Sequence, residues 1–320
     1  MVTAERLIEL LRLEPLGFEG GFYRQTYLSA ASTVGPDGEA RAGATAIYYL
    51  LTPSSRSMMH RLRSDEVYHF YLGDPVDLLL IDPDGRPRSV RLGPDVLGGE
   101  VNQLVVPAGT WQGSSLVPGG AYALMGTTMA PGFHLADFEL GRRSELVERY
   151  PEVAERLRAL TPEVLETPEL ELTAATRDLL VAEGRGVEAL LAGLGAAGAE
   201  AWPPPTRTEA ARAQALRSLA SAPDRLSWGD WYVVQRSDRA LIGTVGFSGP
   251  PGPGGEARLR VRVDPGPAVE AVGALLERCG ASCRAVVAEV EPASGLGRRL
   301  IEGLAFEPGQ GRVVKRLADD

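Results

Sequence analysis

The feature that most constrains the fold of this chain is a change of hydrophobic periodicity near residue 144. Before this point, short apolar runs such as 44–52 and 76–81 are separated by turns rich in glycine and proline, among them Asp82-Pro83-Asp84-Gly85. Short strands at this spacing are typical of a sandwich or barrel and not of a fold that alternates strands with helices. From Ser144 to Leu160, apolar residues recur instead at helical spacing.

A second type of organisation follows residue 162. Extended and helical patterns alternate there: strands at 231–236, 241–248 and 257–263, a helix at 268–279, a strand at 285–290 and a last helix at 296–304. Such alternation predicts a mixed α/β fold. At 320 residues the chain is long enough for two domains. We therefore predict an all-β domain at 1–162 and an α/β domain at 163–320.

Composition narrows the classes of function. The net charge of -9 offers no surface for neutralising phosphates, so we expect no nucleic-acid partner. No apolar run approaches the ~20 residues that a membrane-spanning helix needs, so we expect no membrane partner. The two cysteines, Cys279 and Cys283, are too few for a disulfide framework and indicate free thiols in a cytoplasmic protein. All three histidines lie in the first half, where any chemistry that needs imidazole must take place.

Several segments of the first half resemble one known family. They comprise 19–27, the run His60-Arg61-Leu62-Arg63-Ser64-Asp65-Glu66 with Gly73, Pro107-Ala108-Gly109-Thr110-Trp111-Gln112, and 130–139. Over residues 5–162 the chain resembles the small cupin family of unknown function that is related to sugar-nucleotide epimerases. The resemblance implies a jelly-roll β-barrel that forms a homodimer and has a small-molecule pocket in its mouth. It brings no established reaction.

The same resemblance implies a metal site that is incomplete here. Cupins hold their metal with two histidines two residues apart, a glutamate four residues further on and a histidine from a later strand. In this chain Leu62 replaces the second histidine and Gln112 replaces the last one. The remaining set of His60, Glu66 and Gln112 would hold a first-row divalent metal with water at the open positions, or would hydrogen-bond to one another and to a small ligand. The sequence leaves both alternatives open.

Other residues of the first half are candidates for substrate contact. Arg24 lies on an aromatic-flanked strand and could clamp a carboxylate or phosphate, or form an ion pair at the rim or dimer interface. His60 is the histidine that the motif places to act as a base, and Asp137 could orient it. Aromatic rings could stack a sugar or base. We therefore predict His60 as the catalytic residue, with the following residues binding substrate: Tyr23, Arg24, Tyr68, Trp111 and Gln112.

The second half resembles the GNAT family of N-acetyltransferases over residues 163–316. The resemblance rests on 231–234, on 241–251 with its Gly-Phe-x-Gly-Pro-Pro hairpin, and on 299–306. That family binds the acetyl-CoA pyrophosphate in a loop between its fourth strand and a helix. Here Val263-Asp264-Pro265 runs directly into Gly266-Pro267, so the loop is missing and Pro267 removes an N–H donor. No tyrosine follows Tyr232 to serve as general acid. We expect acetyl-CoA binding to have been lost.

These observations favour a cupin domain that binds a small polar or anionic metabolite, with isomerase- or epimerase-like chemistry, fused to a degenerate acetyltransferase-like domain. Two alternatives from other classes stay open. One is a bifunctional enzyme with acetyl-CoA-dependent N-acetyltransferase activity. The other is a binding module without chemistry in either half. The sequence does not decide whether the protein is an enzyme.

Overall fold

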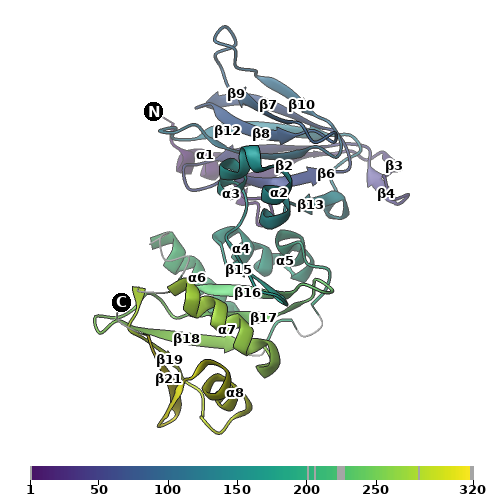
Figure 1. Ribbon diagram of the computed structural model, residues 1–320. Coiled ribbons are helices and arrows are strands. Elements are labelled where there is room, and N and C mark those ends of the chain that lie inside the picture. The colour runs from purple at the N-terminus through teal and green to yellow at the C-terminus, as the bar shows by residue number, and fades with distance from the viewer. Residues whose placement is uncertain (1, 200–201, 205–206, 222–227, 280–281, 318–320) are drawn as a thin grey trace. The chain divides into compact units, whose positions relative to one another are not determined.

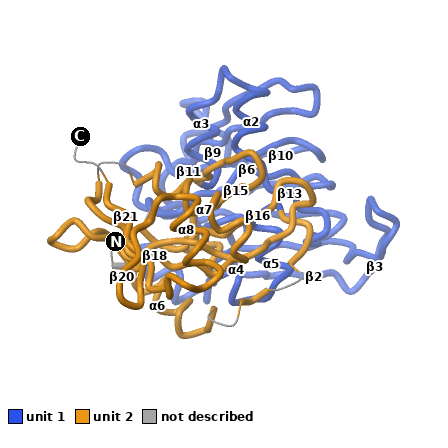
Figure 2. Tube along the Cα trace, turned by 60° about the horizontal axis from the view of Figure 1, so that its bottom comes forward, with its two compact units in different colours: residues 1–162, 181–195 blue, residues 163–180, 196–320 orange. Residues whose placement is uncertain are grey.

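The computed structural model describes residues 2–199, 202–204, 207–221, 228–279 and 282–317. The chain divides into two compact units, coloured separately in Figure 2. The first unit contains the residues up to 162 together with 181–195, and the second contains 163–180 and the residues from 196 onward. The residues 181–195 comprise the end of α4 (Arg177–Arg185) and all of α5 (Val187–Leu194). The chain therefore returns to the first unit after it has begun the second.

Two antiparallel sheets make up most of the first unit. Their strands, in spatial order, are β1 (Glu14–Pro15), β2 (Phe22–Leu28), β5 (Thr45–Leu51), β12 (Ala123–Met129), β7 (Glu66–Gly73) and β10 (Gln103–Val106) in one sheet, and β13 (Phe138–Leu140), β6 (Ser57–Leu62), β11 (Trp111–Leu116), β8 (Val76–Ile81) and β9 (Pro87–Leu92) in the other. A separate hairpin consists of β3 (Ser32–Val34) and β4 (Ala40–Ala42). The prediction of an all-β first domain is confirmed.

The alternation of side chains along each strand separates an inner core from an outer layer. On β8, Leu78 and Leu80 pack with Tyr49 and Met125 of the other sheet, and so lie between the two sheets. Leu79 and its neighbour Ile81 face outward and pack against α2 (Arg143–Arg149) and α3 (Ala154–Ala159). This follows from the two-residue period of a strand.

A helix also covers the outer face of the six-stranded sheet. Leu50 of β5 and Leu124 of β12 pack there against Leu7 of α1 (Ala4–Leu11). Thr3 begins this helix, because its hydroxyl accepts a hydrogen bond from the Arg6 N–H at 3.3 Å. The inner face of the six-stranded sheet therefore carries the core residues and the polar residues described below.

The second unit is built on one eight-stranded sheet, whose elements can be followed in Figure 1. The strand order is β14 (Val164–Glu166), β15 (Leu170–Ala174), β16 (Asp230–Gln235), β17 (Leu241–Phe247), β18 (Glu256–Arg262), β19 (Ala285–Ala288), β21 (Arg312–Arg316) and β20 (Glu307–Gly309). All neighbours are antiparallel except β18 and β19, which are parallel and are joined through α7 (Pro265–Cys279). The mixed α/β prediction for this region is confirmed.

One face of this sheet carries the apolar core of the second unit. Trp231, Val245 and Leu259 pack there against Val272 of α7 and Leu300 of α8 (Gly295–Leu304). The α7 helix begins at Pro265, three residues earlier than the sequence pattern predicts, because proline is well tolerated in the first turn of a helix. The α6 helix (Glu209–Ser221) belongs to the same unit. Among the described helices, none has the length and apolar character to cross a membrane.

Candidate functional site

A group of polar side chains is enclosed between the two sheets of the first unit. His60 of β6 and Gln112 of β11 are each 1% exposed, and Glu66 of β7 is 7% exposed. His60 lies directly opposite Gln112 in the β6–β11 pairing, and Gln112 lies opposite Leu80 of the inner core. The fourth member, Glu19, comes from the connection between β1 and β2. We call these four residues the inner cluster.

The hydrogen bonds of His60 fix how its ring can act. Its Nδ1 lies 2.7 Å from the carbonyl oxygen of Met58. A carbonyl oxygen can only accept, so Nδ1 carries the proton and the lone pair is on Nε2. That Nε2 is buried, has no hydrogen-bond partner among the described residues, and lies 4.0 Å from Oε2 of Glu19. Burial lowers the pKa of His60, so the neutral ring with an available acceptor is the favoured form.

Glu66 and Gln112 are bonded to each other. The Nε2 group of Gln112 donates a hydrogen bond of 2.8 Å to Oε2 of Glu66, which leaves Oε1 of Gln112 buried without a partner among the described residues. Burial raises the pKa of Glu66, and the negative charge of Glu19 raises it further. Tyr68, two residues along β7, shares the inner face with Glu66 and is 2% exposed. Its pKa is raised well above 10 by burial, so the phenol keeps its proton.

Glu19 is a site residue that the motif-based predictions did not include. Its Oε1 accepts a hydrogen bond of 2.7 Å from the Ser57 hydroxyl. Burial raises the pKa of Glu19 to about 7 in spite of that bond, which acts in the opposite direction. Gly20 and Gly21 follow with φ values of 105° and 74°, and a Cβ at Gly21 would lie 2.9 Å from the Tyr49 ring. An acidic residue before a Gly-Gly pair is the sequence signal that could have identified it.

An apolar wall adjoins the inner cluster and keeps water away from it. The His60 ring stacks on Phe138, with centroids 5.1 Å apart and planes 21° apart. Phe18 meets Phe138 edge to face at 4.9 Å. Leu62 belongs to the same wall, and Ala192 of α5 packs against it. A low-dielectric wall of this kind penalises charge and accounts for the direction of the pKa shifts in the cluster.

The predicted substrate-binding residues do not all lie on the same side of the sheets. Tyr23 packs in the inner core and pairs with Tyr49, while the Arg185 guanidinium lies 5.3 Å from the centre of its ring. Arg24 is the next residue along β2 and stands 5.5 Å from the ring of Tyr48 in the outer layer. Because neighbouring residues of a strand point to opposite faces, Arg24 and Tyr23 lie on different faces of the sheet.

Trp111 is displaced from the inner cluster for the same reason. It precedes Gln112 on β11, packs in the outer layer with Met59, and has the Arg61 guanidinium 4.6 Å from its ring centre. Its stacking partner is therefore a guanidinium of the protein. Of the predicted residues, the structure brings together His60, Glu66 and Gln112, with Tyr68 on the same inner face.

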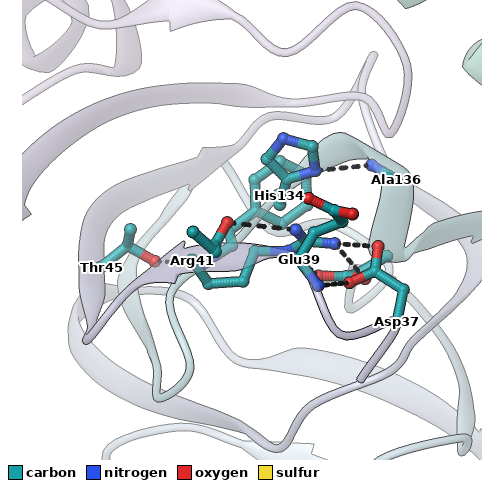
Figure 3. Close-up of polar contacts among 9 residues, drawn as sticks. Asp37, Glu39, Arg41, Thr45, His134 and Ala136 are labelled. Atoms are coloured by element: carbon teal, nitrogen blue, oxygen red, sulfur yellow. Dashed lines mark hydrogen bonds and ion pairs between the residues drawn. The ribbon is translucent and has the colours of Figure 1, made fainter. Parts of the chain in front are cut away.

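Asp137 does not orient His60. Asp137 pairs instead with Arg41, whose contact with Asp37 can be followed in Figure 3. The Arg41 Nε lies 2.8 Å from Oδ2 of Asp137 and its Nη2 lies 3.1 Å from Oδ1. Both side chains are 3% exposed, so this is a buried bidentate ion pair. The nearby His134 is exposed, and its Nδ1 accepts a hydrogen bond from the Ala136 N–H at 3.2 Å.

The donor set of the inner cluster does not fit a resident first-row metal. It offers one imidazole, and the Glu66 carboxylate already accepts from the Gln112 amide. The Glu19 carboxylate likewise already accepts a hydrogen bond, from the Ser57 hydroxyl. Across the described residues, no three histidine, cysteine, aspartate or glutamate side chains are grouped so that they could hold a metal ion. The arrangement is suited instead to hydrogen bonding and proton transfer.

Comparisons with known proteins match the first part of the chain. Residues 5–141 match the family model described as the cupin superfamily (DUF985). An uncharacterized protein of Saccharomyces cerevisiae is 31% identical over 132 residues, which cover 37% of this chain and 66% of that protein, so the chain spans just under two thirds of its length. Among solved structures, a hypothetical protein from Leishmania major is 34% identical, with coverage of 51% of this chain and 100% of the other and a TM-score of 0.48.

A second solved structure is similar to the same region. It is a protein from Shewanella oneidensis, 34% identical, with coverage of 50% of this chain and 98% of the other and a TM-score of 0.46. The family match ends at residue 141 and assigns no family to the second unit. With the all-β fold and the motif residues His60, Glu66 and Gln112 in place, the first part of the chain, residues 5–141, is a domain of the cupin superfamily (DUF985).

Proposed function

We propose that the cupin domain binds a small polar metabolite between its sheets and transfers a proton on it, as an isomerase or epimerase does. One observation supports this above the others. The unpartnered Nε2 of His60 lies 4.0 Å from Glu19, whose pKa is about 7. A buried base beside a half-buried acid that titrates near neutrality is the pairing that general acid–base catalysis requires.

Each member of the inner cluster has a distinct part in this proposal. His60 Nε2 removes a proton from a carbon next to a carbonyl group, and the imidazolium that forms is stabilised by the Met58 carbonyl at Nδ1. Protonated Glu19, on the same side of the ligand, delivers a proton to the carbonyl oxygen. The free Oε1 of Gln112 accepts a hydrogen bond from a hydroxyl group of the ligand. Glu66 holds the Gln112 amide in place.

The proposal predicts solvent-derived deuterium in a substrate. The full chain, incubated in D2O with a panel of hydroxyaldehydes, hydroxyketones and their phosphates, is expected to exchange a carbon-bound proton of at least one member, detected by NMR. A His60→Asn variant should slow this exchange by about 100-fold or more, because general base catalysis contributes on that scale. The exchange should persist in the presence of a chelator.

The matched control is His69→Asn. His69 lies on the same β7 strand as Glu66 but faces outward, where its ring nitrogens lie near Gln103 and Thr128. This variant should exchange at the wild-type rate. Full exchange in His60→Asn would rule out the assigned base, and loss of exchange on chelation would rule out a metal-free site. Binding of a panel member without exchange in the wild type would identify a binding module instead.

We further infer that the second unit is a degenerate acetyltransferase that does not hold acetyl-CoA at the position its resemblance implies. The start of α7 corresponds to that position. Pro265 and Pro267 have no N–H, and the Ala268 N–H already donates to the Asp264 carbonyl at 3.1 Å. Of the first four residues of the helix, Gly266 alone keeps an N–H that could reach a phosphate. At the start of α8, the Gly297 N–H donates to the Ser294 hydroxyl and the Arg298 N–H donates to the Ser294 carbonyl.

This inference predicts that acetyl-CoA does not bind saturably at about 1 mM, the upper end of ordinary Michaelis constants. Isothermal titration of the full chain measures it directly. Saturable binding with one site per chain would contradict the inference and would favour the bifunctional enzyme. Dephospho-CoA and free pantetheine, titrated in parallel, show which part of the cofactor is responsible for any heat that appears.

A further inference from the structure

A second polar cluster lies in the second unit, on the face of the sheet opposite α7 and α8. The residues that pack against those helices, such as Trp231 and Val245, alternate along β16 and β17 with Asp230, Tyr232 and Thr244. The pairing of β16, β17 and β18 forms two adjacent rows across this opposite face. One row consists of Asp230, Gly246 and Arg260, and the other consists of Tyr232, Thr244 and Arg262. Residues paired directly across strands share a face.

Positive charge predominates over the described part of this cluster. Asp230, with a side chain 5% exposed, binds the Arg207 guanidinium through Oδ2. Its Oδ1 lies 2.9 Å from Arg260 and 3.3 Å from Arg262. The guanidinium groups of Arg260 and Arg262 thus share one oxygen of the Asp230 carboxylate. Burial lowers the pKa of Arg262, and the charges of Arg260 and Arg207 lower it further. Guanidinium groups crowded in this way are stabilised when an additional anion joins them.

Two polar atoms of the same rows are buried without partners. Thr244 is 0% exposed, and its Oγ1 has no hydrogen-bond partner among the described residues. The Nε atom of Arg260 is also buried and also has no hydrogen-bond partner among the described residues. Thr244 pairs directly with Arg262 across the β17–β18 ladder, so its hydroxyl stands beside the crowded guanidiniums. Buried polar groups are nearly always satisfied in folded proteins, and an exception calls for a missing partner.

We propose that this cluster is a binding site for the phosphate group of a small metabolite, held by Arg260, Arg262 and the hydroxyl of Thr244. A phosphate offers several acceptor oxygens, which suit both guanidinium forks and a hydroxyl donor. Asp230 then has a positioning role, because it holds the guanidiniums in one place before the ligand arrives. The site is separate from the inner cluster of the cupin domain and does not depend on the proton transfer proposed there.

Titration of the full chain with inorganic phosphate tests the proposal. We expect saturable binding at one site per chain. Arg262→Leu should weaken the affinity by at least about tenfold, since a hydrogen bond to a charged group is lost together with a charge. Thr244→Val has nearly the same shape and should weaken it by about tenfold. The same valine should leave the melting temperature of the ligand-free protein unchanged or higher, because it removes a buried hydroxyl that lacks a partner.

The matched control is Arg258→Leu. Arg258 lies on β18 two residues before Arg260, but it is exposed and already paired with Glu289 at 3.2 Å. Its loss should leave phosphate affinity within about twofold of the wild type, in keeping with the small energies of exposed ion pairs. No saturable binding to the wild type, an equal loss in Arg258→Leu, or unchanged affinity in Thr244→Val would each overturn the site. Acetate binding as tightly as phosphate would overturn its assignment to phosphate.

Discussion

Replacing Asp137 with asparagine is expected to lower the free energy of unfolding of the cupin domain by about 3–5 kcal/mol. The substitution keeps the shape of the side chain and removes its charge. The Arg41 side chain, which is 3% exposed, would stay buried, and Asp37 would be the one carboxylate still paired with it among the described residues. Asp37 is 27% exposed and bonds to Nη2 alone, so Nε of Arg41 would lose a charged acceptor. A buried guanidinium that has lost its main counterion is among the costliest defects in a fold.

The control for this prediction is Glu139→Gln, two residues away. Glu139 also forms a bidentate pair, with Arg61 at 2.8 and 2.9 Å, but the two side chains are 41% and 54% exposed. Loss of that pair should cost about 0–1 kcal/mol, because solvent already screens it. Hydrogen exchange monitored by mass spectrometry resolves the first unit from the second and gives both free energies. Equal losses in the two variants would show that burial of the Arg41–Asp137 pair is unimportant.

The stability of the cupin domain is expected to fall as the pH rises from about 4.5 to about 7, through the titration of Glu19. The folded form holds a proton on this carboxyl up to a pKa of about 7, whereas the unfolded chain releases it near 4.5. The folded state therefore binds more protons in this window, and its stability decreases as protons are withdrawn. A difference of about 2.5 pKa units corresponds to an upper bound on the order of 3 kcal/mol.

The variant Glu19→Gln removes this titration, together with the part of the Glu66 pKa shift that the Glu19 charge causes. Glutamine can still accept the Ser57 hydrogen bond but cannot ionise, so the difference in unfolding free energy between variant and wild type should grow between pH 4.5 and 7 and then level off. His60 gives the opposite trend: its pKa is lowered in the folded protein, so the unfolded chain takes up this proton first and stability falls as the pH drops below about 6.5. This trend is present in both proteins, and the comparison between them cancels it. Hydrogen exchange at three or four pH values measures the difference. A difference that is constant with pH would contradict a raised pKa at Glu19.

The parts of the candidate site that the sequence predicts are those fixed by strand periodicity. His60, Glu66 and Gln112 meet because their motifs lie on strands whose inner faces surround one space. The same periodicity moves Arg24 and Trp111 to the outer layer, since each is one residue from an inward-facing neighbour. Strand periodicity does not predict the positions of residues in the connections between strands. Glu19 lies in such a connection, and its position is set by the positive-φ backbone of Gly20 and Gly21.

Local sequence patterns also do not predict ion pairs between residues that are far apart in the chain. Asp137 pairs with Arg41, which is 96 residues earlier in the chain, and no spacing rule links the two. The charged rows of the second unit become visible only when three strands are placed in register. The sequence therefore predicts both architectures and the centre of the cupin site, while the acid partner of His60 and the arginine cluster depend on the fold.

The return of residues 181–195 to the first unit determines where the protein can be divided. The polypeptide passes from one unit to the other three times, so a single cut cannot release an intact cupin domain. A gene fragment that stops at residue 162 would omit α5 and leave the wall of Leu62 and Phe138 without the helix that carries Ala192. An insertion or fusion point chosen at the first boundary, after residue 162, would therefore separate α5 from the wall against which Ala192 packs.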